Sequence, residues 1–245
     1  MRKLMIYTTG LFFLMAIQGC DKEGVCVKST GKIVTENRIA LPYNYIEVYD
    51  NINLFLVQDS ALSEIKVEAG ENLIAGIITD IDSGRLVLRN ANSCNWLRSF
   101  EVPVNVYLKF TRLDTIIFQA AGNITCLNAW TNDSVYIYVI EGAGQLNFNL
   151  DVGRSFIHVR YGTVSMKVAG QSPVTFIISQ GYGPVHAEEL ISKFTYVSTS
   201  SPNDVYVFAS EELDVEIGNI GNVYYSGAPK DITANIYGDG KLIEF

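Results

Sequence analysis

The sequence contains little proline, histidine and basic charge. Its 245 residues include 6 Pro, 2 His and 18 Lys or Arg against 26 Asp or Glu, which gives a formal net charge of −8. Nucleic acids and anionic headgroups require basic patches, and no run of Lys or Arg is present, so neither is expected as a partner of the protein surface. The two histidines, His158 and His186, lie in no catalytic or metal-binding motif and are expected to be outward strand residues.

Helical periodicity is also scarce. Beyond the N-terminal segment, no stretch keeps a helical pattern for more than about two turns. Strict alternation of apolar and polar residues occurs instead, for example in Leu146–Leu150, Val164–Val168 and Leu213–Ile217. A period of two is typical of strands with one buried face. The sequence therefore predicts an all-β chain.

A glycine-containing turn followed by a short alternating strand recurs from Ala121 to the C-terminus. The first apolar residues after these turns are Ile124, Leu146, Val164, Val185, Val205, Val223 and Leu242, spaced 18 to 22 residues apart. A unit of this kind cannot bury its apolar face alone, so neighbouring units must stack. We predict a single-chain parallel β-helix, or β-solenoid, with coils of about 20 residues and longer coils in its first half.

The N-terminus has the form of an export signal. Arg2 and Lys3 precede an apolar run over residues 4–17, and Ala16–Cys20 resembles a bacterial lipobox. We expect residues 1–19 to be a lipoprotein signal peptide, and residues 20–39 to be an acylated Cys20 with a flexible tether. Without residues 1–19 the chain has two fewer basic groups and a formal charge of −10. Multiple acyl chains on Cys20 would anchor the protein firmly in a membrane.

Three cysteines remain beyond Cys20, an odd number for an oxidising compartment. One disulfide is possible among Cys26, Cys94 and Cys126, with Cys26–Cys94 the favoured pair. Their spacings match no zinc motif. Cys126 lies in an alternating segment and is predicted to be a core residue.

Acidic residues and tyrosines are the remaining candidates for chemistry. The acidic residues that could cluster on neighbouring coils as a polysaccharide-cleaving site are Glu188-Glu189, Asp204 and Glu211-Glu212-Asp214-Glu216. Glu188-Glu189 and Glu211-Glu212 fall at predicted turns, where solvated charges are ordinary. The turn Asn and Asp residues lack the spacing of calcium-binding repeats, and we expect them to bond to their own backbone. Tyrosines that alternate with buried valines should face outward and could stack on a sugar ring or a partner protein. These tyrosines are Tyr136, Tyr138, Tyr206 and Tyr224.

Several segments together resemble a known family. They are YIEVYDNINLFLVQ, IKVEAGENLI, GRLVLRN, VPVNVYLK, LDTIIFQAAGNI and LDVEIGNIGNVYYSGAPKDITANIYGDGKL, the last with Tyr225, Gly227 and Pro229 between two Gly-rich turns. Over residues 40–245 the chain resembles the auto-transporter adhesin head domain called the GIN domain. The resemblance implies a β-solenoid envelope protein, often a lipoprotein of Bacteroidetes. Turns written AGN, YGT or SPND depart from the Gly-Ser-Gly-Asp form that is common in that family.

These observations predict a lipid-anchored envelope protein that acts as an adhesin or binding module. We expect the outer membrane as its location, with exposure on the cell surface favoured because Asp21-Lys22-Glu23 looks like the export tags of surface lipoproteins. The expected partners are the membrane, through the lipid, and a glycan or protein ligand. No catalytic activity, cofactor or metal is expected. A purely structural envelope protein and a polysaccharide-acting β-helix enzyme are the alternatives.

Overall fold

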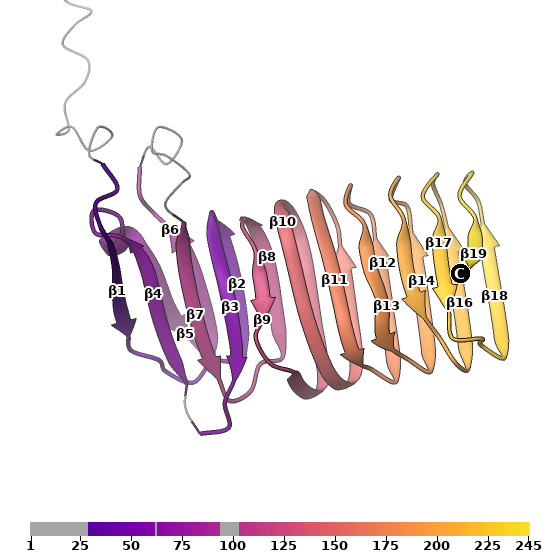
Figure 1. Ribbon diagram of the computed structural model, residues 1–245, viewed down its shortest axis with the longest axis horizontal. Helices are drawn as coiled ribbons and strands as arrows, with labels where there is room; N and C mark the ends of the chain where they lie inside the picture. The colour runs from indigo at the N-terminus through magenta and orange to yellow at the C-terminus, as the bar shows by residue number, and fades with distance from the viewer. Residues whose placement is uncertain (1–28, 62, 94–102) are drawn as a thin grey trace, which may run out of the picture.

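A computed structural model describes residues 29–61, 63–93 and 103–245. It is a flattened β-solenoid whose coils stack along one long axis (Figure 1). The described residues contain the strands β1 (Ile33–Arg38), β2 (Tyr45–Asp50), β3 (Ile52–Gln58), β4 (Glu64–Gly70), β5 (Ile77–Asp82), β6 (Arg85–Asn90), β7 (Val104–Phe110), β8 (Thr115–Ala121), β9 (Ile124–Cys126), β10 (Trp130–Val159), β11 (Thr163–Gln171), β12 (Val174–Ser179), β13 (Val185–Ile191), β14 (Phe194–Thr199), β15 (Val205–Phe208), β16 (Glu212–Ile217), β17 (Val223–Ser226), β18 (Asp231–Ile236) and β19 (Leu242–Glu244). One short 3-10 helix spans Ile74–Gly76, and no helix among these residues is long and apolar enough to cross a membrane.

The strands form two broad faces around one core. Face A consists of β5, β6, β2, β8, the first and last parts of β10, β12, β14, β16 and β18. Face B consists of β1, β4, β7, β3, β9, the middle of β10, β11, β13, β15, β17 and β19. Each coil contributes one strand to each face, and the inward residues of both faces form a single apolar cluster.

The observed register confirms coils of about 20 residues. On face B, Leu146 pairs with Met166, Met166 with Val185, and Val185 with Val205. The turn spacing predicts that Val164 is the equivalent of Leu146, which is wrong by two residues because Val164 pairs with Gly144. A shift of two keeps every side chain on its own face, so the alternation by itself cannot detect it.

The N-terminal end differs from the series of longer coils that was expected. Strands β1, β4 and β5 pair antiparallel with their neighbours. The β2–β3 coil lies between the β6–β7 and β8–β9 coils, so the stacking order there does not follow the sequence. The tether predicted over residues 20–39 is wrong for Ile33–Arg38, because β1 pairs with β4 along its whole length and covers the edge of face B.

The corners that lead from face A to face B are tight. Gly142 has φ 139°, and a Cβ atom there would clash with the carbonyl oxygen of Ala120 in the neighbouring coil. Only glycine combines this left-handed backbone with so close an approach. Gly218 also lies at a corner, but a Cβ there would meet its nearest atom at 3.5 Å. The corner glycines thus differ in how strictly the fold requires them.

Some turn side chains bond to their own backbone, as expected: Asn132 Oδ1 accepts a hydrogen bond from Asp133 N–H, and Asn219 Oδ1 accepts one from Ile220 N–H. Other polar side chains at the corners connect successive coils, which was not expected. Asn123 Oδ1 accepts a hydrogen bond from the Gln145 backbone N–H at 2.9 Å. Asp204 Oδ1 accepts one from Asn222 N–H, and Asn222 Oδ1 accepts one from Lys241 N–H, both at 2.9 Å. These bonds span 18 to 22 residues in sequence. They satisfy corner backbone groups that the two faces leave unpaired.

Asp114 makes a similar connection at the opposite edge of the solenoid. Its carboxylate accepts hydrogen bonds from Asn44 Nδ2 and Asn132 Nδ2 at 2.8 Å and from Arg112 Nε at 2.9 Å. Burial alone would raise the pKa of Asp114, but the three donors and the positive charge of Arg112 outweigh it and lower the pKa. The ionised carboxylate therefore holds three parts of the chain together.

Candidate functional site

A column of stacked rings runs along the outer side of face A. We call Tyr136, Phe156, Phe176 and Tyr196 the ring ladder. Their successive ring centroids lie 4.8, 4.8 and 4.9 Å apart, with interplanar angles of 8°, 3° and 15°. These spacings equal the distance between neighbouring strands, so the register that pairs Phe156 with Phe176 and Phe176 with Tyr196 also stacks their side chains.

Stacking changes what the rings can offer to a ligand. Both faces of Phe156 and Phe176 lie against neighbouring rings, so mainly their edges point to solvent. The two inner rungs therefore offer no open ring face to a ligand. A sugar needs an open ring face for stacking. Tyr196, the last rung, has one, because its partner in the next coil is Asp214 rather than another ring.

The four tyrosines singled out in the sequence lie on outward positions, but they do not form one stripe. Tyr136 and Tyr138 belong to face A, with ring centroids 6.4 Å apart. Tyr206 and Tyr224 stack at 4.8 Å on face B, on the opposite side of the core. His186 stacks on Tyr206 at 4.6 Å. Two separate surfaces therefore replace the single aromatic surface, and ligand contact by these tyrosines remains a prediction.

A hollow lies at the C-terminal end of the ring ladder. We call it the face A groove. It encloses about 380 Å³, and its outward-facing lining residues are Phe156, Phe176, Ile178, Tyr196, Ser198, Asp214, Glu216 and Asn235. The register places these residues on β10, β12, β14, β16 and β18. Aromatic and aliphatic groups make up most of the lining, and a hydroxyl, two carboxylates and an amide make up its polar part.

The polar part of the groove lining is acidic. Ser198 Oγ donates a hydrogen bond to Glu216 Oε2 at 3.2 Å, and none of the lining residues is basic. Burial raises the pKa of Tyr196, and the nearby charges of Glu212 and Asp214 raise it further. The Tyr196 hydroxyl therefore stays protonated and able to donate at neutral pH. The groove suits a neutral ligand rich in hydroxyl groups better than an anionic one.

The other candidates are scattered. Glu188 and Glu189 lie on β13 of face B, whereas Glu211 precedes β16 of face A. His158 and His186 are outward strand residues, as expected, next to Gln180 at 3.3 Å and Glu188 at 3.2 Å. Among the described residues, no group of three or more His, Cys, Asp or Glu side chains could hold a metal ion.

Of the cysteines, only Cys126 falls within the described part of the chain. It lies on β9 and packs against the core, as predicted, and burial raises the pKa of its thiol to about 12. Cys20, Cys26 and Cys94 lie outside the described residues. The lipidation and the Cys26–Cys94 pair therefore remain predictions.

The face A groove and the rungs Phe156, Phe176 and Tyr196 are not among the features predicted from the sequence. Tyr136, Phe156, Phe176 and Tyr196 follow one another at intervals of 20 residues, the period already found in the turns. The strands that precede the turns therefore carry the signal for the ladder. Asp214 and Glu216 were considered only as members of an acidic cluster, because their nearness to Tyr196 depends on the register of β14 and β16.

Comparisons with known proteins agree with this architecture. The solved structure of a protein described as a "putative adhesin" from Bacteroides fragilis matches with a TM-score of 0.80 and 20% identity, over 87% of this chain and 97% of that one. A "putative adhesin" from Parabacteroides merdae matches with a TM-score of 0.66 and 15% identity, over 89% and 98%. A "putative lipid binding protein" from Parabacteroides distasonis matches with a TM-score of 0.63 and 15% identity, also over 89% and 98%.

At these identities the likeness establishes the fold alone. No curated protein matches the sequence. The family model described as "Putative auto-transporter adhesin, head GIN domain" matches residues 42–229, which is most of the chain. The protein therefore belongs to the GIN-domain family of adhesin head domains, as the resemblance in its sequence implied.

Proposed function

We propose that this protein is a lipid-anchored envelope adhesin that binds a glycan in the face A groove and has no catalytic activity. The observation that carries the proposal is the composition of that groove. An open ring face on Tyr196 and the apolar surface of Phe176 and Ile178 lie beside Ser198 and the carboxylates of Asp214 and Glu216. Sugars present C–H faces and hydroxyl groups together, so a lining that offers both contacts suits them.

The rigidity of the groove supports binding. Its lining residues lie on strands held by neighbours on both sides, except Asn235 on the last face A strand. A preformed site loses little conformational entropy when a ligand binds. The volume of about 380 Å³ falls in the usual range for small-ligand sites and would hold one or two sugar residues of a longer chain.

The placement of the acids supports a binding role over hydrolysis. A glycosidase needs one carboxylic acid kept protonated by burial and a second carboxylate across the scissile bond. Asp214 and Glu216 are two residues apart on one strand, and Glu216 is exposed to solvent. They are well placed to accept hydrogen bonds from hydroxyl groups on the same side of a ligand. Turnover of a polysaccharide by the purified protein would contradict this part of the proposal.

The anchor is tested separately from the groove. Metabolic labelling with a palmitate analogue should mark the full chain and should disappear in Cys20→Ala. A label that persists in this variant would contradict lipidation at Cys20. Protease treatment of intact cells then tests whether the solenoid is exposed on the cell surface. Binding of a glycan outside the cell requires that exposure.

Binding is tested on a glycan array with variants inside and outside the groove. Asp214→Asn and Tyr196→Leu should each lower the affinity for a bound glycan at least tenfold, because each removes a different contact. Tyr138→Ser is the matched control, since Tyr138 is an outward aromatic of face A that does not line the groove. Equal losses in all three variants would place the ligand elsewhere. No binding to any glycan would favour a purely structural envelope protein or a protein ligand.

A further inference from the structure

One narrow edge of the solenoid carries exposed aromatic and aliphatic side chains at four of its last five corners. It is formed by the corners that join face A strands to face B strands in the last coils, residues 160–162, 180–184, 200–204, 218–222 and 237–241. We call its four exposed apolar residues the corner ridge. They are Tyr161, Tyr182, Ile220 and Tyr237, with 54%, 64%, 59% and 77% of their surface exposed.

The backbone beneath the ridge is fixed from coil to coil. Tyr182 N–H donates to the Gly162 carbonyl at 2.7 Å, and Asn203 Nδ2 donates to the Tyr182 carbonyl at 2.8 Å. Asn219 Nδ2 donates to the Ser200 carbonyl, also at 2.8 Å. The ridge side chains therefore project from backbone that is held in place by hydrogen bonds between coils, and their exposure follows from the geometry of the corners.

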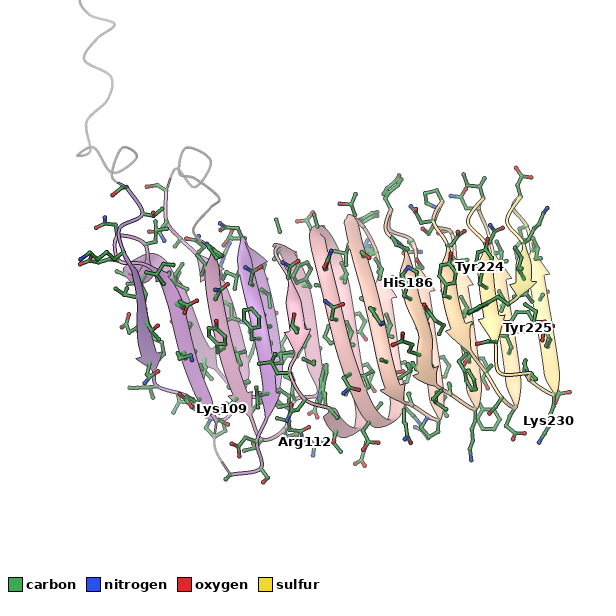
Figure 2. All side chains as sticks on the ribbon, viewed as in Figure 1. Lys109, Arg112, His186, Tyr224, Tyr225 and Lys230 are labelled. Atoms are coloured by element: carbon green, nitrogen blue, oxygen red, sulfur yellow. The ribbon has the colours of Figure 1, made fainter. Side chains whose placement is uncertain are left out.

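The ridge is electrically neutral on an acidic protein. Its five corners contain Arg160, Asp204, Asp239 and Lys241, which sum to zero, whereas the whole chain carries −8. The opposite edge is richer in charge, and Lys109, Arg112 and Lys230 lie along it in Figure 2. A neutral, tyrosine-rich surface meets no net electrostatic repulsion at a zwitterionic headgroup layer. The rest of the protein surface is acidic and would be repelled by anionic headgroups.

The chain enters the solenoid on the same edge. Strand β1 begins at the edge that carries the corner ridge (Figure 1). The first described residue, Ser29, is held there by a hydrogen bond of 2.9 Å from Asn72 Nδ2 to its carbonyl oxygen. Cys20 lies nine residues earlier, a stretch that spans at most about 32 Å when fully extended. An acyl group on Cys20 would hold this edge close to the membrane.

We propose that the corner ridge rests in the interfacial layer of a zwitterionic bilayer, so that the solenoid lies lengthwise on the membrane. The inference depends on the lipid anchor of the proposed function. Tyrosine suits this layer because its ring is apolar and its hydroxyl remains hydrated. Contact at both the N-terminal anchor and the C-terminal coils holds the long axis parallel to the bilayer. Faces A and B then stand upright, which leaves the face A groove open.

The proposal is tested on the acylated full chain reconstituted into vesicles of phosphatidylethanolamine and phosphatidylcholine with brominated acyl chains. Tyr182→Trp places a fluorescent reporter on the ridge, and Ile191→Trp, at a 52% exposed position on the opposite edge, is the matched control. The parent chain, with Trp96 and Trp130, supplies the background. We expect the bromolipid to quench the added fluorescence at least twice as strongly at position 182 as at position 191.

The possible results separate the two proposals. If the chain takes up the palmitate label but quenching is weak, or equal at positions 182 and 191, the lipid anchor stands and the membrane-facing ridge is overturned. Loss of labelling would overturn both. Stronger quenching at position 182 that disappears in a chain also carrying Tyr161→Ser, Ile220→Ser and Tyr237→Ser would support the ridge. Loss of adhesion by such a chain without any quenching in the parent reporter would assign the ridge to an external partner and overturn the inference.

Discussion

Replacing the central ring of the ladder should destabilise the protein by an amount set by its two stacking contacts. Phe176 lies between Phe156 and Tyr196, with ring centroids 4.8 and 4.9 Å away. Phe176→Leu keeps an apolar side chain but removes both contacts. Aromatic pairs contribute about 0.5–1.5 kcal/mol each beyond the area they bury, so we expect a loss of about 1–3 kcal/mol in the free energy of unfolding.

A double-mutant cycle isolates one contact. Tyr196→Leu removes the end rung and should cost about half as much, because Tyr196 stacks on one ladder ring only. The double variant should cost less than the sum of the two single changes, with a coupling energy of about 0.5–1.5 kcal/mol. Phe156 and Tyr196 are separated by a rung, so the same pair of changes at those positions should be additive within about 0.5 kcal/mol.

Urea unfolding followed by circular dichroism gives these free energies, provided that the slopes of the variants stay equal to that of the parent. A coupling between Phe176 and Tyr196 no larger than that between Phe156 and Tyr196 would refute the reasoning. The ladder would then be a consequence of the register without a stabilising contribution of its own.

Three further predictions concern acid stability, corner geometry and thiol reactivity. Asp114→Asn should lower stability by about 1–3 kcal/mol at pH 7. The pKa of Asp114 is lowered in the folded protein, so the stability that the parent gains from this carboxylate is fully present above the unfolded pKa of about 4 and disappears as the pH falls further. Urea titrations from pH 7 to 2.5 would detect this loss. A stability difference between parent and variant that stays constant with pH would contradict it. Gly142→Ala should lower the free energy of unfolding, measured by thermal unfolding, by more than about 3 kcal/mol, whereas Gly218→Ala should change it by less than about 1 kcal/mol. Equal effects of the two changes would contradict the corner geometry. Cys126 should resist alkylation by iodoacetamide at pH 8 in the folded protein and react in urea, with Cys126→Ser as the blank, since burial raises the pKa of its thiol to about 12.

Much of the candidate site was implicit in the chain. The 20-residue interval that relates Tyr136, Phe156, Phe176 and Tyr196 is present in the sequence and follows from the length of one coil. The corner ridge was harder to find, because Tyr161 and Ile220 occupy different places within their turns. Their exposure depends on the path of each corner, which the pattern of apolar residues does not specify.

The sequence by itself determined the class of fold, the coil length and which strand residues point inward. Alternation and repeat length suffice for this, because an apolar face that one coil cannot bury must be covered by the next. The tertiary structure decided that Leu146 pairs with Met166 and not with Val164, two residues earlier. It also decided that β1, β4 and β5 pair antiparallel and that the β2–β3 coil lies between coils formed later in the sequence. Parallel and antiparallel partners bury the same alternating residues, so only the packed coils distinguish them.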